Sequence, residues 1–96
     1  MSKVTVVATA VAKPGKEKEL ERILTGLIEP TRKEEGFIQY DLHRSLDDPR
    51  VFIFFEIWES RAHLDKHAQN DHLVKYREEA KDLIERKELH ILEQIG

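Results

Sequence analysis

The hydrophobic positions of this chain change period several times, and each change predicts a new element of secondary structure. Residues 4–12 are apolar or β-branched at nearly every position, which is typical of a strand buried on both faces. From Lys16 to about Glu35 the apolar residues recur three and four positions apart, which predicts an amphipathic helix. We expect Pro30 either to kink the last turns of this helix or to begin a new one, and Gly36 to end the segment.

The second half of the chain begins with a predicted hairpin. Residues 37–46 and 51–59 are predicted to be strands, and Asp47-Asp48-Pro49-Arg50 between them has the composition of a turn. Ser60 follows the second strand and can cap a short helix over residues 61–68.

The remaining elements complete a recognisable order. A helix is predicted from about His72 to Arg86, where Asn70-Asp71 can cap it, and a last strand over residues 88–95. The charged stretches 16–22 and 77–87 are expected to be solvated helix faces. The order β-α-β-β-α-β predicts an α+β, ferredoxin-like fold, in which helices cover one face of an antiparallel sheet.

Two of the predicted strands have more apolar surface than one layer of helices can cover. The strand over residues 51–59 is apolar on both faces, as is the strand over residues 4–12. A helix-free face of this composition would be a large exposed apolar patch. We therefore expect a homodimer that packs sheet face against sheet face, and the alternative is a monomer with an exposed apolar face. The residues concerned in the third strand are Val51, Ile53, Phe55 and Ile57.

Composition narrows the class of protein. With 96 residues, the chain is expected to form one domain over residues 1–96. Its net charge of −3 gives no electrostatic footprint for nucleic acid. The absence of cysteine excludes disulfides, thiolate zinc sites and iron–sulfur clusters. There is no apolar run of about 18 residues and no signal peptide, so we expect a soluble, cytoplasmic protein with no membrane partner.

The third predicted strand carries the most informative pattern. Because alternate residues of a strand face the same side, Phe52, Phe54, Glu56 and Trp58 are predicted to share one face. This face is an apolar wall with one ionisable group and one indole N–H. Such a wall suits a pocket for a flat organic molecule, and His67 and His72 follow shortly after it.

Several segments, in order, resemble the antibiotic-biosynthesis monooxygenase (ABM) family. The most specific runs from Glu56-Ile57-Trp58-Glu59-Ser60 to His67 and continues to Asn70-Asp71-His72. The chain is most similar to the quinol monooxygenase branch of that family. The other segments are residues 11–17, 30–40 and 42–49.

The resemblance implies a dimeric α+β barrel with a pocket inside each subunit, between sheet and helices. It also implies oxidation of polycyclic phenols or quinols by O₂ without metal or flavin, so no cofactor is expected. A deprotonated quinol is electron-rich enough to pass an electron to O₂, provided that the protein removes a proton and excludes water. The chain also contains no Gly-x-Gly-x-x-Gly and no P-loop motif.

Other activities occur among similar proteins, and the fold does not choose between them. Relatives that degrade haem use an asparagine on the first strand, and residues 4–12 contain none. An isomerase or degradative enzyme for a small signalling metabolite stays open, as does a non-catalytic dimer that binds a small molecule.

Two residues are candidates for acid–base chemistry. His67 matches the family's histidine on the helix over the pocket, and a reference pKa of about 6.5 suits proton abstraction from a phenol. The alternative is a packed histidine without a chemical function. Glu56, if buried, would have a raised pKa and could act as a base or orient a histidine. The alternative is a structural partner for Arg44 or for a backbone group.

The remaining candidates concern the substrate and metals. Trp58 and Tyr40 could hold an aromatic ring or simply fill the core. The other expected substrate-binding residues are Phe52, Phe54, His72 and Arg44. His63 and His67 lie four residues apart on a helix, but the sequence has no His-Glu-x-x-His pattern and no evident further ligand, so no metal site is expected.

Overall fold

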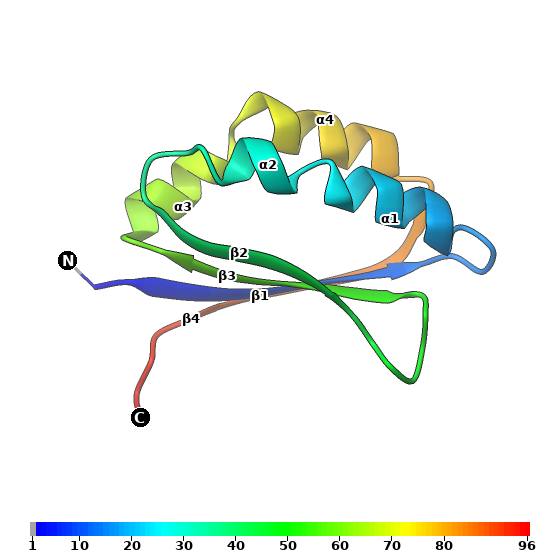
Figure 1. Ribbon diagram of the computed structural model, residues 1–96, viewed down its shortest axis with the longest axis horizontal. Coiled ribbons are helices and arrows are strands. Elements are labelled where there is room, and N and C mark those ends of the chain that lie inside the picture. Colours follow the sequence, from blue (N-terminus) through cyan, green and yellow to red (C-terminus); the bar gives the residue numbers. More distant parts are fainter. Residues whose placement is uncertain (1) are drawn as a thin grey trace.

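In the part of the chain that the structure describes, the sheet has four antiparallel strands in the order β2-β3-β1-β4, and helices lie on only one of its faces (Figure 1). This arrangement, seen in a computed structural model that describes residues 2–96, confirms the ferredoxin-like prediction. The strands are β1 (Val4–Ala12), β2 (Phe37–Arg44), β3 (Val51–Trp58) and β4 (Ile84–Leu92). The helices are α1 (Glu17–Thr25), α2 (Ile28–Thr31), α3 (Arg61–Ala68) and α4 (Asp71–Ala80).

The alternation in β3 is as the sequence predicts. The four side chains that face the helices are no more than 6% exposed, whereas those between them are half-buried. Glu56 pairs with Val6 of β1 on one side and with Tyr40 of β2 on the other. The register therefore brings Tyr40 and Glu56 together on the helix-covered face. The four buried residues are Phe52, Phe54, Glu56 and Trp58.

The segment from Lys16 to Glu35 is not one helix, and of the two expectations for Pro30 the start of a new helix is the one confirmed. The chain instead forms two helices, and the break falls at Gly26 and Leu27, before Pro30. A proline ring clashes with the carbonyl four residues earlier, which here belongs to Gly26. Pro30 consequently sits in the first turn of α2, where no intrahelical partner for its missing N–H is required.

Gly36 positions the loop that follows α2. Its φ of 84° lies in the left-handed region that favours glycine. A Cβ atom at this position would also collide with the side chain of His63. The absence of a side chain thus lets the loop before β2 lie directly against α3.

The predicted length of the last helix is also wrong. Instead of reaching Arg86, α4 ends at Ala80, and β4 begins at Ile84 rather than at residue 88. The physical reason is that β1 is a central strand whose backbone groups need partners on both edges, and residues from Ile84 onward supply them. This register places Lys87 opposite Ala10.

The other face of the sheet carries no helix within residues 2–96 (Figure 1). Val7 pairs with Phe55 on this face, and both side chains are half-buried. None of the helices in this part of the chain is long and apolar enough to cross a membrane.

Candidate functional site

A cavity of about 350 Å³ lies between the helix-covered face of the sheet and the helices. Its volume falls within the range of roughly 300–1,000 Å³ that is usual for small-molecule pockets. Five residues singled out by the sequence contribute to its wall. They are Tyr40, Phe52, Phe54, Glu56 and His67.

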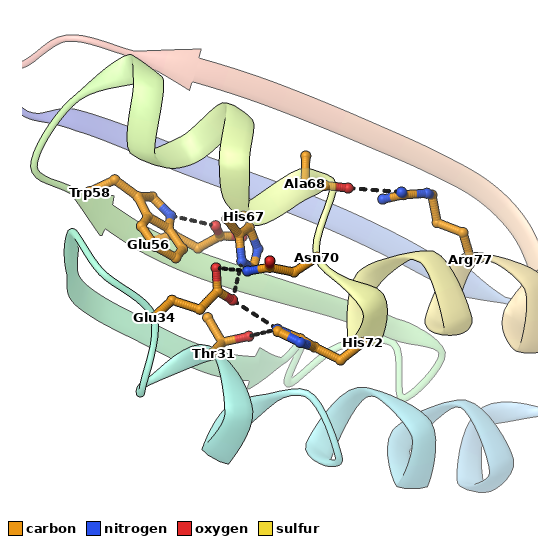
Figure 2. A network of polar contacts seen from close by, with 9 residues as sticks. All are labelled: Thr31, Glu34, Glu56, Trp58, His67, Ala68, Asn70, His72 and Arg77. Atoms are coloured by element: carbon orange, nitrogen blue, oxygen red, sulfur yellow. Dashed lines mark hydrogen bonds and ion pairs between the residues drawn. The ribbon is translucent and has the colours of Figure 1, made fainter.

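His67 is held in place by a carboxylate from a distant part of the chain (Figure 2). It lies in the last turn of α3 and is 4% exposed. Its Nδ1 atom is 2.7 Å from Oε2 of Glu34. An ionised carboxylate only accepts hydrogen bonds, so Nδ1 carries the proton and Nε2 of the neutral ring is free to act as a base.

Glu34 is the centre of a small polar network (Figure 2). Asn70 donates its side-chain amide to Oε1 of Glu34 at 2.6 Å, although the sequence suggests Asn70 as a cap of α4. His72, in the first turn of α4, places Nε2 2.8 Å from Oε2 of Glu34 and 3.3 Å from the Thr31 hydroxyl. The network thus joins the loop after α2 to the junction between α3 and α4.

The same network offers a set of metal ligands. Glu34, His67 and His72 each supply one potential ligand atom, and these three atoms lie within 4.8 Å of one another. A set of two imidazoles and one carboxylate suits zinc or iron. In the structure Nδ1 of His67 and Nε2 of His72 are both hydrogen-bonded to Oε2 of Glu34. His63, the other histidine of the predicted pair, contacts Ser60 at 2.8 Å and is not part of this group.

Glu56 has Trp58 as its partner rather than Arg44 (Figure 2). The indole Nε1 atom donates a hydrogen bond to Oε1 of Glu56 at 3.0 Å. Burial raises the pKa of Glu56 to about 7, and the bond from Trp58 opposes this increase. The carboxyl group can therefore hold or release a proton near neutral pH.

The ring of His67 lies between aromatic neighbours. Its centroid is 4.5 Å from that of Trp58 and 5.6 Å from that of Tyr40. Burial lowers the pKa of His67, whereas the Glu34 carboxylate opposes the decrease. The imidazole is thus kept neutral in an apolar setting, as a base requires.

Tyr40 remains protonated in this setting. It is 2% exposed, and its ring stacks on Phe54 with centroids 4.4 Å apart. Burial raises the pKa of the Tyr40 hydroxyl well above its usual value, and the nearby Glu56 adds to the increase. Tyr40 can consequently serve as a hydrogen-bond donor but not as a base.

Three predicted site residues do not line the cavity. Arg44 forms an ion pair with Glu21 and lies beside a smaller hollow against Phe52. Trp58 and His72 lie behind the wall, where they contact Glu56 and Glu34. For these two the structure shows a supporting contact with an ionisable group instead of direct access to the cavity.

Glu34 is the main residue that the sequence interpretation missed. It stands in the charged run Lys33-Glu34-Glu35, which gives no sign of a buried partner. In the structure its side chain is 10% exposed, whereas that of Glu35 is 80% exposed. The sequence feature that could have identified Glu34 is its position within residues 30–40, one of the segments that resemble the family.

The sequence of this chain matches one family and is similar to several known proteins. Residues 3–79 match the family described as "Antibiotic biosynthesis monooxygenase". "Putative monooxygenase Rv0793" from Mycobacterium tuberculosis is 35% identical over 85 residues, which cover 88% of this chain and 83% of that protein. "Uncharacterized protein sll1783" from Synechocystis is 33% identical over 81 residues, which cover 84% of this chain but 55% of that longer protein.

Solved structures agree with these sequence matches. The crystal structure of PA3566 from Pseudomonas aeruginosa has a TM-score of 0.95 at 31% identity, covering 100% of this chain and 97% of that one. The structure of Rv0793 has a TM-score of 0.93 at 32% identity, covering 99% and 97% of the two chains.

Proposed function

Because the chain belongs to the antibiotic biosynthesis monooxygenase family, we propose that it oxidises an aromatic quinol or phenol with O₂ and needs no cofactor. The observation that carries this proposal is a buried, neutral imidazole in the wall of an apolar cavity, fixed by the Glu34 carboxylate. This arrangement suits the removal of a proton from a phenol inside a dry pocket.

In the proposed reaction, Nε2 of His67 takes the proton of a substrate hydroxyl group. The negative charge of Glu34, 2.7 Å from Nδ1, stabilises the imidazolium that forms. A buried carboxylate acts in this way on the histidine of a serine-protease triad. The proton transfer leaves an electron-rich phenolate in the cavity.

The phenolate then supplies the electrons for the reaction with O₂. A ring carbon forms a bond to oxygen and gives a hydroperoxide. The O–O bond breaks, one oxygen stays as a carbonyl group and the other leaves as water with two hydrogens that the substrate has lost. Glu56, with a pKa of about 7, can give a proton to the departing oxygen.

The other wall residues would position the ring. Tyr40 can donate a hydrogen bond to a substrate oxygen, while Phe52 and Phe54 keep water away. Trp58 holds Glu56 by its indole N–H, and His72 holds Glu34. In this proposal Trp58 and His72 are positioning residues.

We also propose that two copies pack through the helix-free faces of their sheets. The support is the row of half-buried apolar side chains there, which includes Ile53, Phe55 and Ile57. Burying such a face in a symmetric dimer removes it from water.

Oxygen uptake tests the proposed function directly. Purified protein is given a panel of reduced naphthoquinols and anthrones, and autoxidation is subtracted. We expect enzyme-dependent uptake that His67→Ala abolishes, whereas His43→Ala, at an exposed position on β2, retains it. Conversion of a candidate substrate under nitrogen would favour an isomerase instead. Retained binding without any conversion would favour a binding protein.

A further inference from the structure

The residues that line the cavity fall into a buried group and an exposed group. Most lining residues are buried, and the exposed ones come from the end of α3, from α4 and from β4. These residues therefore mark the mouth of the cavity. They are Ala68, Arg77, Lys87, Glu88 and Leu89.

Two of the mouth residues are cations that are held in place. Nη2 of Arg77 donates a hydrogen bond to the carbonyl oxygen of Ala68 at 2.8 Å (Figure 2). Lys87 pairs with Ala10 in the sheet, so its side chain lies on the helix-covered face, and its Nζ is 5.3 Å from the centroid of the Tyr76 ring. The sequence suggests only a solvated helix face for both residues.

Neither cation has a carboxylate within 4.0 Å among residues 2–96. Glu88 pairs with Thr9, so its side chain lies on the helix-free face of the sheet, where its carboxylate contacts His90 at 2.8 Å. Burial and the charge of Arg77 both lower the pKa of Lys87, and the charge of Arg77 also lowers the pKa of His67. The mouth thus carries two positive charges that repel each other.

The inner end of the cavity carries acidic side chains instead of basic ones. Glu56 lines it, and Glu34 lies behind His67. A permanently charged carboxylate of the substrate would therefore be placed less favourably beside these two acidic side chains than beside the two cations at the mouth. The cavity is therefore electrically polarised from its acidic inner end to its basic mouth.

We propose that the substrate is an aromatic phenol or quinol that carries a carboxylate, and that Arg77 and Lys87 bind this carboxylate at the mouth of the cavity. The inference rests on the proposed function for the identity of the ring. The apolar interior takes the aromatic ring, and the hydroxyl group at its far end reaches His67. The guanidinium of Arg77 suits paired hydrogen bonds to a carboxylate, and Lys87 adds a point charge.

The test measures binding without turnover. Isothermal titration calorimetry under nitrogen compares 6-hydroxy-2-naphthoate with its uncharged parent 2-naphthol, whose hydroxyl group is the same. We expect wild-type protein to bind the carboxylate at least fivefold more tightly, and this preference to shrink as salt is raised.

Variants then assign the preference to the two cations. Lys87→Gln and Arg77→Gln are each expected to weaken binding of the carboxylate about fivefold while changing binding of 2-naphthol less than twofold. Lys75→Gln is the control, because Lys75 is exposed on α4 but does not line the cavity. Circular dichroism checks that each variant is folded.

Two results would overturn the inference. One is that wild-type protein shows no preference for the carboxylate, including the case in which neither probe binds. The other is that Lys87→Gln and Arg77→Gln weaken both probes equally or neither. Because these measurements consume no O₂, the inference can fail while oxygen uptake is retained, and it can hold for a protein without oxygenase activity.

Discussion

Nδ1 of His67 lies 2.7 Å from Oε2 of Glu34, although 33 positions separate the two residues in the sequence. The backbone explains how they meet. The N–H of Glu34 donates to the carbonyl oxygen of Thr31 at 3.0 Å, so the loop turns tightly after α2 and directs the carboxylate toward α3. This contact gives the imidazole both its tautomer and its orientation, and the first two predictions depend on it.

Replacing Glu34 by Gln should lower kcat for oxygen uptake by about 100-fold, within the range attributed to general acid–base catalysis. Glutamine keeps the size of the side chain but loses the charge that stabilises the imidazolium. Glu35→Gln is the matched control, since that neighbouring side chain is 80% exposed. Steady-state oxygen-electrode kinetics measure both variants. Equal activity of Glu34→Gln and wild-type protein would remove Glu34 from the mechanism.

The pH dependence of kcat/KM should report the neutral form of His67. Because burial lowers its pKa, activity should be retained as pH falls to 6.5 and decline only below that value. Glu34→Gln should move this acidic limb to still lower pH, since Glu34 is the group that opposes the decrease. NMR titration of the imidazole nitrogens gives an independent value. A decline in kcat/KM of the wild-type protein that already begins above pH 6.5 as the pH is lowered would contradict this prediction.

Glu56→Gln should stabilise the protein at alkaline pH and have little effect at acidic pH. The carboxyl has a pKa of about 7 when folded and 4.5 as its ordinary value. The unfolded chain therefore ionises first as pH rises, and stability falls between pH 4.5 and 7. The shift corresponds to roughly 3 kcal/mol in the free energy of unfolding.

Urea unfolding at pH 4.5 and pH 8 measures this difference. Glutamine retains an oxygen that accepts the N–H of Trp58 but cannot ionise. The wild-type protein and the variant should have similar stability at pH 4.5, whereas the variant should be the more stable at pH 8. A difference that does not change with pH would show that Glu56 does not titrate with a raised pKa.

Dialysis against a chelator should leave oxygen uptake within twofold of its initial value if the reaction needs no metal. The relevant cluster is formed by Glu34, His67 and His72, in which both histidines are hydrogen-bonded to Oε2 of Glu34. Elemental analysis before and after dialysis is the control. Loss of uptake that one added divalent metal restores would contradict the cofactor-free proposal and point to this cluster.

Phe55→Lys should convert the proposed dimer into a monomer. Phe55 lies on the helix-free face of the sheet, where a buried charge without a partner is costly. Val74→Lys is the control, because Val74 is 50% exposed on α4. Sedimentation velocity gives the mass of each species. A wild-type monomer, or a dimer that tolerates Phe55→Lys, would argue against this interface.

The sequence by itself determined the features that depend on local periodicity. Alternation along residues 51–59 places Phe52, Phe54, Glu56 and Trp58 on one face, because side chains of a strand point to opposite faces in turn. The cap is equally local: Ser60 accepts the N–H of His63 at 3.2 Å and begins α3 at the predicted residue.

Only the tertiary structure decided which distant residues meet. The apolar residues of the segment up to Arg86 also fit helical spacing. Residues from Ile84 onward form β4 instead, because the backbone of β1 requires hydrogen-bond partners on both of its edges. The path of the loop after α2 brought Glu34 to His67, and the pairing of β2 with β3 set Tyr40 beside Glu56. Such contacts join residues that no local period relates, because each depends on how whole elements pack.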